Sequence, residues 1–386
     1  MHPMLALALV VVAGIGVTHL SRPHLRHFAS LDAMLAAGAP FVLLGLLLGP
    51  GLRVLDGPTL RALAPLTALG IGWVGAAFGA RLDWRLLRRV PPRAWGLGAA
   101  LAATVFAVTG LAAWVLVRTV PPLAAAWHPT MPAVVTLAAA ATISAGWAGP
   151  KLVRRTALFD TAFAAVAIAV TLPLSHPHGA VRGVALTLFA SAGLAALFVW
   201  LARWRPDATH LGIEFLAVIL LASGFGYAAG LSPFVLCALT TALMVHFSPQ
   251  PRRVHALLAQ WGPSIYVAFL IVAGALLRLP TVWLIPAALL LAVVRIGARW
   301  SSVRFGRIWP PVRALPPHFG LATVAPGAAG VALAAGFGLG YGDSGAVLTA
   351  VLAGVLLAEA LGGPLRQLAR GEPTPLTAAP PRAEVT

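Results

Sequence analysis

Two apolar stretches, AVVTLAAAATISAGWAGPKLV at 133–153 and FGLATVAPGAAGVALAAGFGLG at 319–340, are each long enough to cross a membrane. Both contain helix-disrupting residues, which are Gly146, Gly149 and Pro150 in the first stretch and Pro326 and Gly327 in the second. A break at membrane depth frees backbone carbonyls and amides, which is tolerated only where protein or a water-filled cavity surrounds them. Two ordinary kinked helices are the alternative interpretation, because glycine and proline are common in membrane spans.

The composition of the whole chain indicates a polytopic membrane protein. Hydrophobic residues make up 60% of the 386 residues and charged residues only 10%, against roughly 25% charged residues in soluble domains. The formal charge of +17 does not indicate nucleic-acid binding, because the basic residues are spread between the apolar runs, where arginine anchors helix ends in the lipid bilayer. The single cysteine, Cys237, excludes a disulfide framework and a thiolate metal cluster.

The apolar runs predict about thirteen membrane helices, since each span needs ~20 mostly apolar residues. The expected helices lie near 3–20, 31–50, 58–80, 94–118, 132–153, 156–174, 181–203, 208–228, 232–248, 262–279, 281–303, 317–340 and 344–368. We expect the first to be a retained helix rather than a cleaved signal peptide, because no basic segment precedes it and Arg22 and Arg26 follow it. The transmembrane domain is therefore expected over 1–368, followed by a disordered, Pro-rich cytoplasmic tail at 369–386.

The two broken stretches occupy equivalent places when the spans are divided into halves. A first repeat of about six helices at 3–174 and a second at 208–368 are joined by a connector helix near 181–203. The connector reverses the second half, so we expect inverted repeats. Paired interrupted segments at corresponding places of two halves are typical of the substrate site of a secondary transporter.

The distribution of basic residues predicts the orientation in the membrane. Of the 27 Lys and Arg residues, 20 fall on the side that carries the C-terminus and five on the other side, while Arg295 and Arg299 lie within a span. Cytoplasmic loops are enriched in basic residues. We therefore expect a multi-pass protein of the cell (inner) membrane, with the N-terminus outside and the C-terminus in the cytoplasm.

Few ionisable side chains are predicted at membrane depth. Asp160 opens the sixth span, shortly after the first break, and a carboxylate there costs ~2.5–3.5 kcal/mol on insertion scales, which makes it a candidate functional group. A structural ion pair with a basic neighbour is the alternative. Arg295 and Arg299 lie one turn apart on one face of the eleventh span. A buried guanidinium requires a carboxylate or the carbonyls of a helix end, and we expect the two arginines to be the charge partners at the site. Glu359 in the last span is the next candidate acid, with a helix–helix hydrogen bond as its alternative role.

Motifs for other kinds of chemistry do not occur in the sequence. There is no HExxH zinc motif and no phosphate-binding GxxxxGK[ST] loop, so neither a metal enzyme nor an ATP-driven pump is indicated. We predict no enzymatic activity, no cofactor, and no metal beyond a transported alkali cation.

Several segments resemble the monovalent cation:proton antiporter superfamily, most closely its antiporter-2 branch of sodium/proton and potassium/proton exchangers. These segments are LLGLLLGPGL (43–52), LDWRLLRRVPPRAWG (82–96), LFDTAFAAVAI (158–168), LSPFVLCALTTALMV (231–245) and SIYVAFLIVAGALLRL (264–279). The resemblance implies a dimerisation part and a mobile core, with two unwound helices crossing at the centre. It also implies a homodimer that exchanges H⁺ for Na⁺ or K⁺ by alternating access.

The chain departs from the family pattern at the ion site. The family's ion helix usually carries two adjacent acids, whereas here Asp160 is followed by Thr161. With Asp160 as the only carrier, we expect Thr161, Ser144 and Thr142 to supply neutral oxygens and Arg299 to balance the charge, in a one-for-one exchange. The missing acid leaves two alternatives open, which are a carrier of an organic or anionic solute on the same scaffold and a non-transporting membrane subunit.

Overall fold

The computed structural model describes residue 12 and the ranges 38–82, 92–144, 159–169, 179–204, 208–248, 250–306, 319–324, 327–342 and 345–370. The regular structure in these residues is entirely helical, which confirms the all-α fold class. Five helices are long and apolar enough to cross a membrane, namely Gly98–Thr119, Val181–Trp204, His210–Ala228, Pro251–Ala275 and Leu284–Arg304. Shorter apolar helices accompany them, and the expected first span near 3–20 lies almost wholly outside the described residues.

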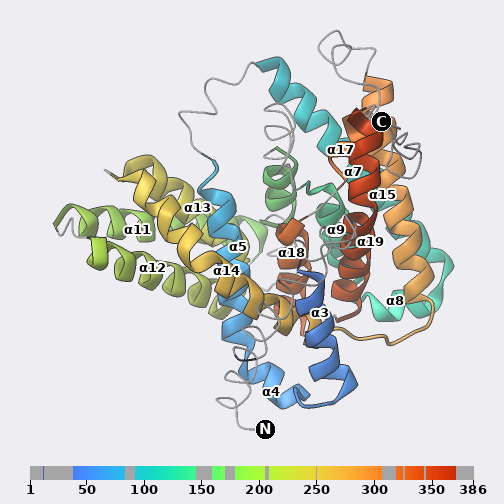
Figure 1. Ribbon diagram of the computed structural model, residues 1–386, viewed down its shortest axis with the longest axis horizontal. Helices are drawn as coiled ribbons and strands as arrows, with labels where there is room; N and C mark the ends of the chain where they lie inside the picture. The colour runs from blue at the N-terminus through green and yellow to red at the C-terminus, as the bar shows by residue number, and fades with distance from the viewer. Residues whose placement is uncertain are drawn as a thin grey trace, which may run out of the picture.

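The helices form two groups that lie side by side (Figure 1). The first group contains α3 (Ala39–Leu46), α5 (Ala64–Gly79), α11 (Ala180–Trp204), α12 (Ala208–Ala228), α13 (Pro233–Phe247) and α14 (Pro251–Ala275). The second group contains α7 (Pro92–Thr119), α9 (Thr130–Thr142), α15 (Leu284–Gly306), α17 (Phe319–Ala322), α18 (Gly327–Tyr341) and α19 (Gly345–Arg370). Contacts between α18 and α5 join the two groups.

The helix α5 packs closely on α13 at the centre of the first group. Small residues allow this approach: a Cβ atom on Gly79 would lie only 2.0 Å from the backbone oxygen of Ala238. Most of α5 is buried, so this helix is surrounded by other helices and not by lipid. A uniformly apolar helix without a polar face is the type that belongs in such a position.

One expected span is divided in two. Where a single helix was expected at 58–80, α4 (Gly57–Ala62) ends and α5 begins on either side of Leu63. Pro65 lies in the first turn of α5. A proline lacks the amide hydrogen that would continue the hydrogen bonds of the preceding helix, so α4 ends and a new helix begins there.

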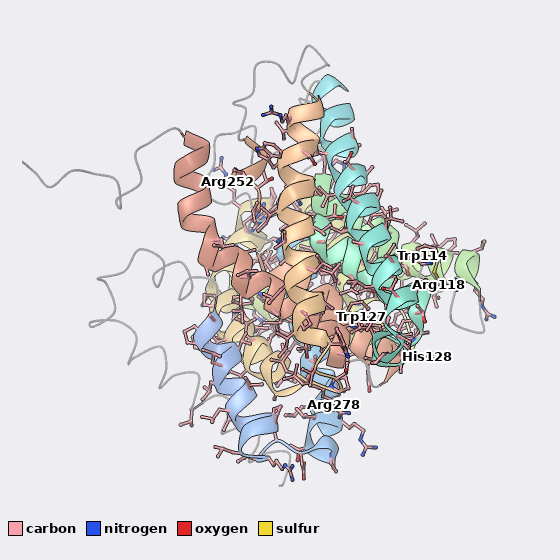
Figure 2. All side chains as sticks on the ribbon, turned by 90° about the vertical axis from the view of Figure 1, so that its right-hand side faces the viewer. Trp114, Arg118, Trp127, His128, Arg252 and Arg278 are labelled. Carbon is pink, nitrogen blue, oxygen red and sulfur yellow. The ribbon has the colours of Figure 1, made fainter. Side chains whose placement is uncertain are left out.

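Another helix is longer than the apolar run that predicted it. The expected span at 262–279 corresponds to α14, which begins at Pro251 and exposes Arg252, Arg253 and His255 in its first turns. Hydropathy locates only the part of a helix that is apolar on all sides, so a polar extension is missed. Arg252, in the first turn of α14, and Arg278, after its end, lie toward opposite ends of the molecule (Figure 2).

Neither of the two stretches that were predicted to be interrupted is continuously helical over its described residues. Helix α9 ends at Thr142, and Ile143 is extended, with φ −68° and ψ 137°. In the second stretch, Thr323 and Val324 separate α17 from α18, which begins at Gly327. The first helix therefore ends before the glycines and proline that were expected to break it. The residues Gly146, Gly149, Pro150 and Pro326 lie outside the described part of the chain.

Candidate functional site

A buried ion pair joins the helix Phe159–Ala169 to α15. Asp160 lies in the helix Phe159–Ala169 and is 2% exposed, and Arg299 of α15 is 4% exposed. The Nη1 atom of Arg299 donates to Oδ2 of Asp160 at 2.7 Å. The hydroxyl of Ser144, just after the end of α9, donates to the same oxygen at 2.7 Å. Charge-assisted bonds of this length are the strong ones, and burial strengthens them further.

The guanidinium of Arg299 also contacts both interrupted helices. Its Nη2 atom donates to the carbonyl of Thr142, the last residue of α9. Its Nη1 atom donates to Oγ1 of Thr323 at 3.2 Å, in the break between α17 and α18. The Nε atom is buried and has no hydrogen-bond partner among the described residues. A single planar fork therefore connects Asp160 to the two breaks, a geometry that lysine with its one nitrogen does not reproduce.

Arg295, one turn earlier on α15, binds the end of α9 from beside Arg299. Its Nε atom donates to the carbonyl of Ala141 at 2.7 Å, and its Nη2 atom donates to the carbonyl of Ile143 at 2.8 Å. The last carbonyls of a helix lack intrahelical partners and carry partial negative charge. The two arginines together satisfy three consecutive carbonyls, which explains how α9 can end within the protein interior.

The predicted neutral ligands are brought together only in part. Ser144 contacts Asp160 as expected, but Thr142 turns its hydroxyl back to the carbonyl of Ala138 at 2.8 Å and offers its own carbonyl instead. Thr161 is buried beside Asp160 in the sequence, at 4% exposure. Glu359 lies in α19, and its side chain is outside the described residues.

The sequence interpretation missed Thr323. Its hydroxyl accepts from Arg299 and donates to the carbonyl of Gly320 at 2.8 Å. The available signal was its position three residues before Pro326, where a broken helix leaves carbonyls for side chains to satisfy. A small cavity borders Asp160, Arg299 and Thr323 and is completed by Leu101, Val105, Ser302 and Val303. The carboxylate of Asp160 is thus buried within the protein and borders this small cavity.

Substituting Gly320 is expected to disturb the ion pair from the backbone side. A Cβ atom at this position would lie 2.0 Å from the backbone oxygen of Arg299, so Gly320→Ala forces α17 away from α15. Overpacking of this kind destabilises by typically 1–3 kcal/mol. Thermal unfolding in detergent measures the loss, and Gly297→Ala on α15, where no atom lies within 4 Å of the added Cβ, serves as the control. An unchanged unfolding temperature for Gly320→Ala would contradict this packing.

The fold and the site define a multi-pass helical membrane protein with a buried carboxylate–guanidinium pair between two interrupted helices. A solved structure with a similar fold is that of the sodium proton antiporter MjNhaP1 from Methanocaldococcus jannaschii at pH 8. The two structures agree with a TM-score of 0.68 over 94% of this chain and 100% of that chain, at 16% sequence identity. No protein-family model matches the sequence, and no curated protein matches it significantly. The likeness is therefore one of fold.

Proposed function

We propose that the protein is a secondary-active antiporter that exchanges protons for a monovalent cation, Na⁺ or K⁺, by alternating access. The observation that carries the proposal is the burial of Asp160 beside both helix breaks, in a fold shared with a sodium proton antiporter. A carboxylate buried in a membrane span is a functional candidate by default, and the structural ion pair with Arg299 that was the alternative role is also present here. The order of the motifs supports membership of the antiporter-2 branch.

In the proposed mechanism Arg299 occupies the place of the substrate cation between turnovers. Its guanidinium is surrounded by oxygens from Asp160, Thr142 and Thr323, with Ser144 on the same carboxylate. Oxygen ligands of this type are those that hard cations prefer. A proton that binds Asp160 displaces Arg299 from the carboxylate alone, whereas an alkali cation also takes the carbonyl and hydroxyl oxygens that the guanidinium leaves. One carboxylate then carries one charge in either direction, so the exchange is one-for-one and electroneutral.

Reconstitution tests the proposal directly. Purified protein in proteoliposomes with an internal pH dye receives external Na⁺, K⁺ or Li⁺. We expect proton efflux driven by at least one of these cations, at a rate that an imposed membrane potential does not change. The absence of proton movement under every alkali-cation gradient would refute the proposal.

A carrier of an anionic solute on the same scaffold is a second candidate, because the described site holds two guanidiniums and one carboxylate. Arg295 and Arg299 lie one turn apart on α15 and bind the end of α9, and Asp160 pairs with Arg299. The excess positive charge suits a negative ligand. Anion gradients applied to the same vesicles separate this candidate from the first. If neither cations nor anions are transported, the remaining interpretation is a membrane subunit that does not transport.

We also propose that the chain forms a homodimer in the inner membrane, with the termini on opposite sides and the C-terminus in the cytoplasm. The 20-to-five distribution of basic residues supports this orientation. The sole native cysteine, Cys237, is fully buried. Single cysteines introduced at residues 2 and 386 are therefore the accessible thiols, and we expect an impermeant maleimide applied to whole cells to label only the first. Labelling of both ends from one side would contradict the orientation.

A further inference from the structure

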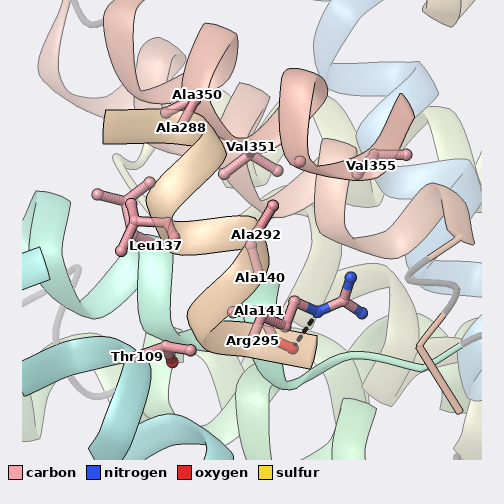
Figure 3. A pocket seen from close by; sticks show the side chains of 12 residues that line it. Thr109, Leu137, Ala140, Ala141, Ala288, Ala292, Arg295, Ala350, Val351 and Val355 are labelled. Atoms are coloured by element: carbon pink, nitrogen blue, oxygen red, sulfur yellow. Dashed lines mark hydrogen bonds between the residues drawn. The ribbon is translucent and has the colours of Figure 1, made fainter. Parts of the chain in front are cut away.

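A second cavity, separate from the ion pair, lies between α7, α9, α15 and α19. It is partly open, and the space of about 430 Å³ between its walls includes the open surroundings at its mouth, so the enclosed part is much smaller. Leu137 of α9, Ala292 of α15 and Val351 of α19 project toward this space (Figure 3). The lining consists of small and apolar side chains except for Thr109 and Arg295.

Both polar lining residues direct their hydrogen bonds to the backbone. The hydroxyl of Thr109 donates to the carbonyl of Val105 within α7. Arg295 donates to the carbonyls at the end of α9, as the dashed line in Figure 3 shows for Ala141. A buried water needs two to four polar partners, and apolar cavities stay dry and accept hydrocarbons. The chemistry of the walls therefore favours an apolar occupant.

The bilayer supplies such an occupant at the outer surface of the same helices. Helices α7 and α15 lie side by side on one face of the molecule (Figure 2). Their outward residues are apolar and exposed, with Leu111 at 62%, Leu289 at 49% and Val293 at 62%. In a membrane these side chains contact lipid acyl chains. The atoms that line the cavity behind these side chains lack dispersion contacts on one side, and an inserted acyl chain would supply them.

We propose that this cavity binds one acyl chain of a bilayer lipid, inserted alongside α7 and α15 with its end against the last turn of α9. The head group stays outside, because the lining is apolar apart from Thr109 and Arg295, whose described hydrogen bonds go to the backbone. The chain would touch Ala140, next to the carbonyl that Arg295 caps. The proposal concerns lipid binding and does not depend on antiport.

Photolabelling tests the site. The probe is a phosphatidylcholine with a diazirine at the end of one acyl chain, mixed into proteoliposomes, irradiated and mapped by peptide mass spectrometry. In the wild type we expect adducts on Leu137 or Val351. Ala292→Phe fills the cavity and is expected to reduce these adducts several-fold, whereas Ala107→Phe, on the exposed face of α7, leaves them unchanged.

Two outcomes would overturn the proposal. Adducts confined to outward residues such as Leu289 and Val293 would show that the chain stays at the surface. Equal labelling from a probe with the diazirine on its head group would show that the occupant is polar. Should Ala292→Phe not fold, the milder Ala288→Leu narrows the same space, and its cavity adducts should fall relative to those on the outward residues. Cavity adducts that persist at the wild-type ratio would also contradict the proposal.

Discussion

Asp160→Asn is expected to reduce cation–proton exchange to the rate of empty vesicles. The amide has the shape of the carboxylate and still accepts a hydrogen bond from Arg299, but it neither releases a proton nor neutralises a cation. Thr161 beside it does not replace this function, because a hydroxyl stays protonated near neutral pH. No other carboxylate contacts the ion pair among the described residues, so the variant removes the exchanging group.

The Asn variant should nevertheless fold. Its Arg299 keeps the carbonyl of Thr142 and the hydroxyl of Thr323 as acceptors, and the partial negative charge at the end of α9 remains nearby. Size-exclusion chromatography and thermal unfolding verify the fold before the vesicle assay. Glu214→Gln is the matched control, since Glu214 is a partly buried acid of α12 in the other helix group. Wild-type exchange by Asp160→Asn would sink the assignment and make Glu359 the next carboxylate to test.

Much of the fold was predictable because helices that cross a membrane are runs of apolar residues, which the hydropathy of the sequence reveals. α11, α12 and α13 begin and end close to their expected limits, since each is a continuous apolar run between polar residues. The start of α14 was missed because its first turns are helical but polar on one face. The division at Leu63 was missed because a proline in the first helical turn is compatible with either one kinked helix or two.

The site was predictable in its charges, whereas helix-end carbonyls were foreseen as partners of the buried arginines without the helix that supplies them. A buried acid requires a basic partner, and Arg295 and Arg299 are the basic residues that fall within a predicted span. Arg299 was therefore an expected partner of Asp160. The role of Arg295 depends on where α9 ends, more than 150 residues away in the sequence. A helix end has no side-chain signature when its carbonyls are satisfied from another helix. Thr142 was expected to lend a neutral oxygen, and the oxygen that Arg299 contacts is its carbonyl, because the hydroxyl of a threonine within a helix can bond its own preceding turn.

Arg299→Ala is expected to have the larger effect on stability, lowering the free energy of unfolding by roughly 3–5 kcal/mol. Removing the guanidinium leaves the buried side chain of Asp160 without its cationic partner, with the hydroxyl of Ser144 as the donor that the structure still describes. It also leaves the carbonyl of Thr142 at the end of α9 without the donor that Arg299 provides. Arg304→Ala is the control, because Arg304 is exposed near the end of the same helix, where such changes are usually within ±0.5 kcal/mol.

The double variant Asp160→Asn/Arg299→Ala separates the two contributions to this loss. If the uncompensated carboxylate dominates, replacing it by an amide should restore much of the stability, so that the double variant unfolds at a higher temperature than Arg299→Ala alone. A saturating alkali cation should stabilise Arg299→Ala in the same way, since it would occupy the oxygens that the guanidinium vacates. Purely additive losses, with no effect of Na⁺, K⁺ or Li⁺ on the single variant, would show that Arg299 holds the helix ends in place and does not compete with a cation for Asp160.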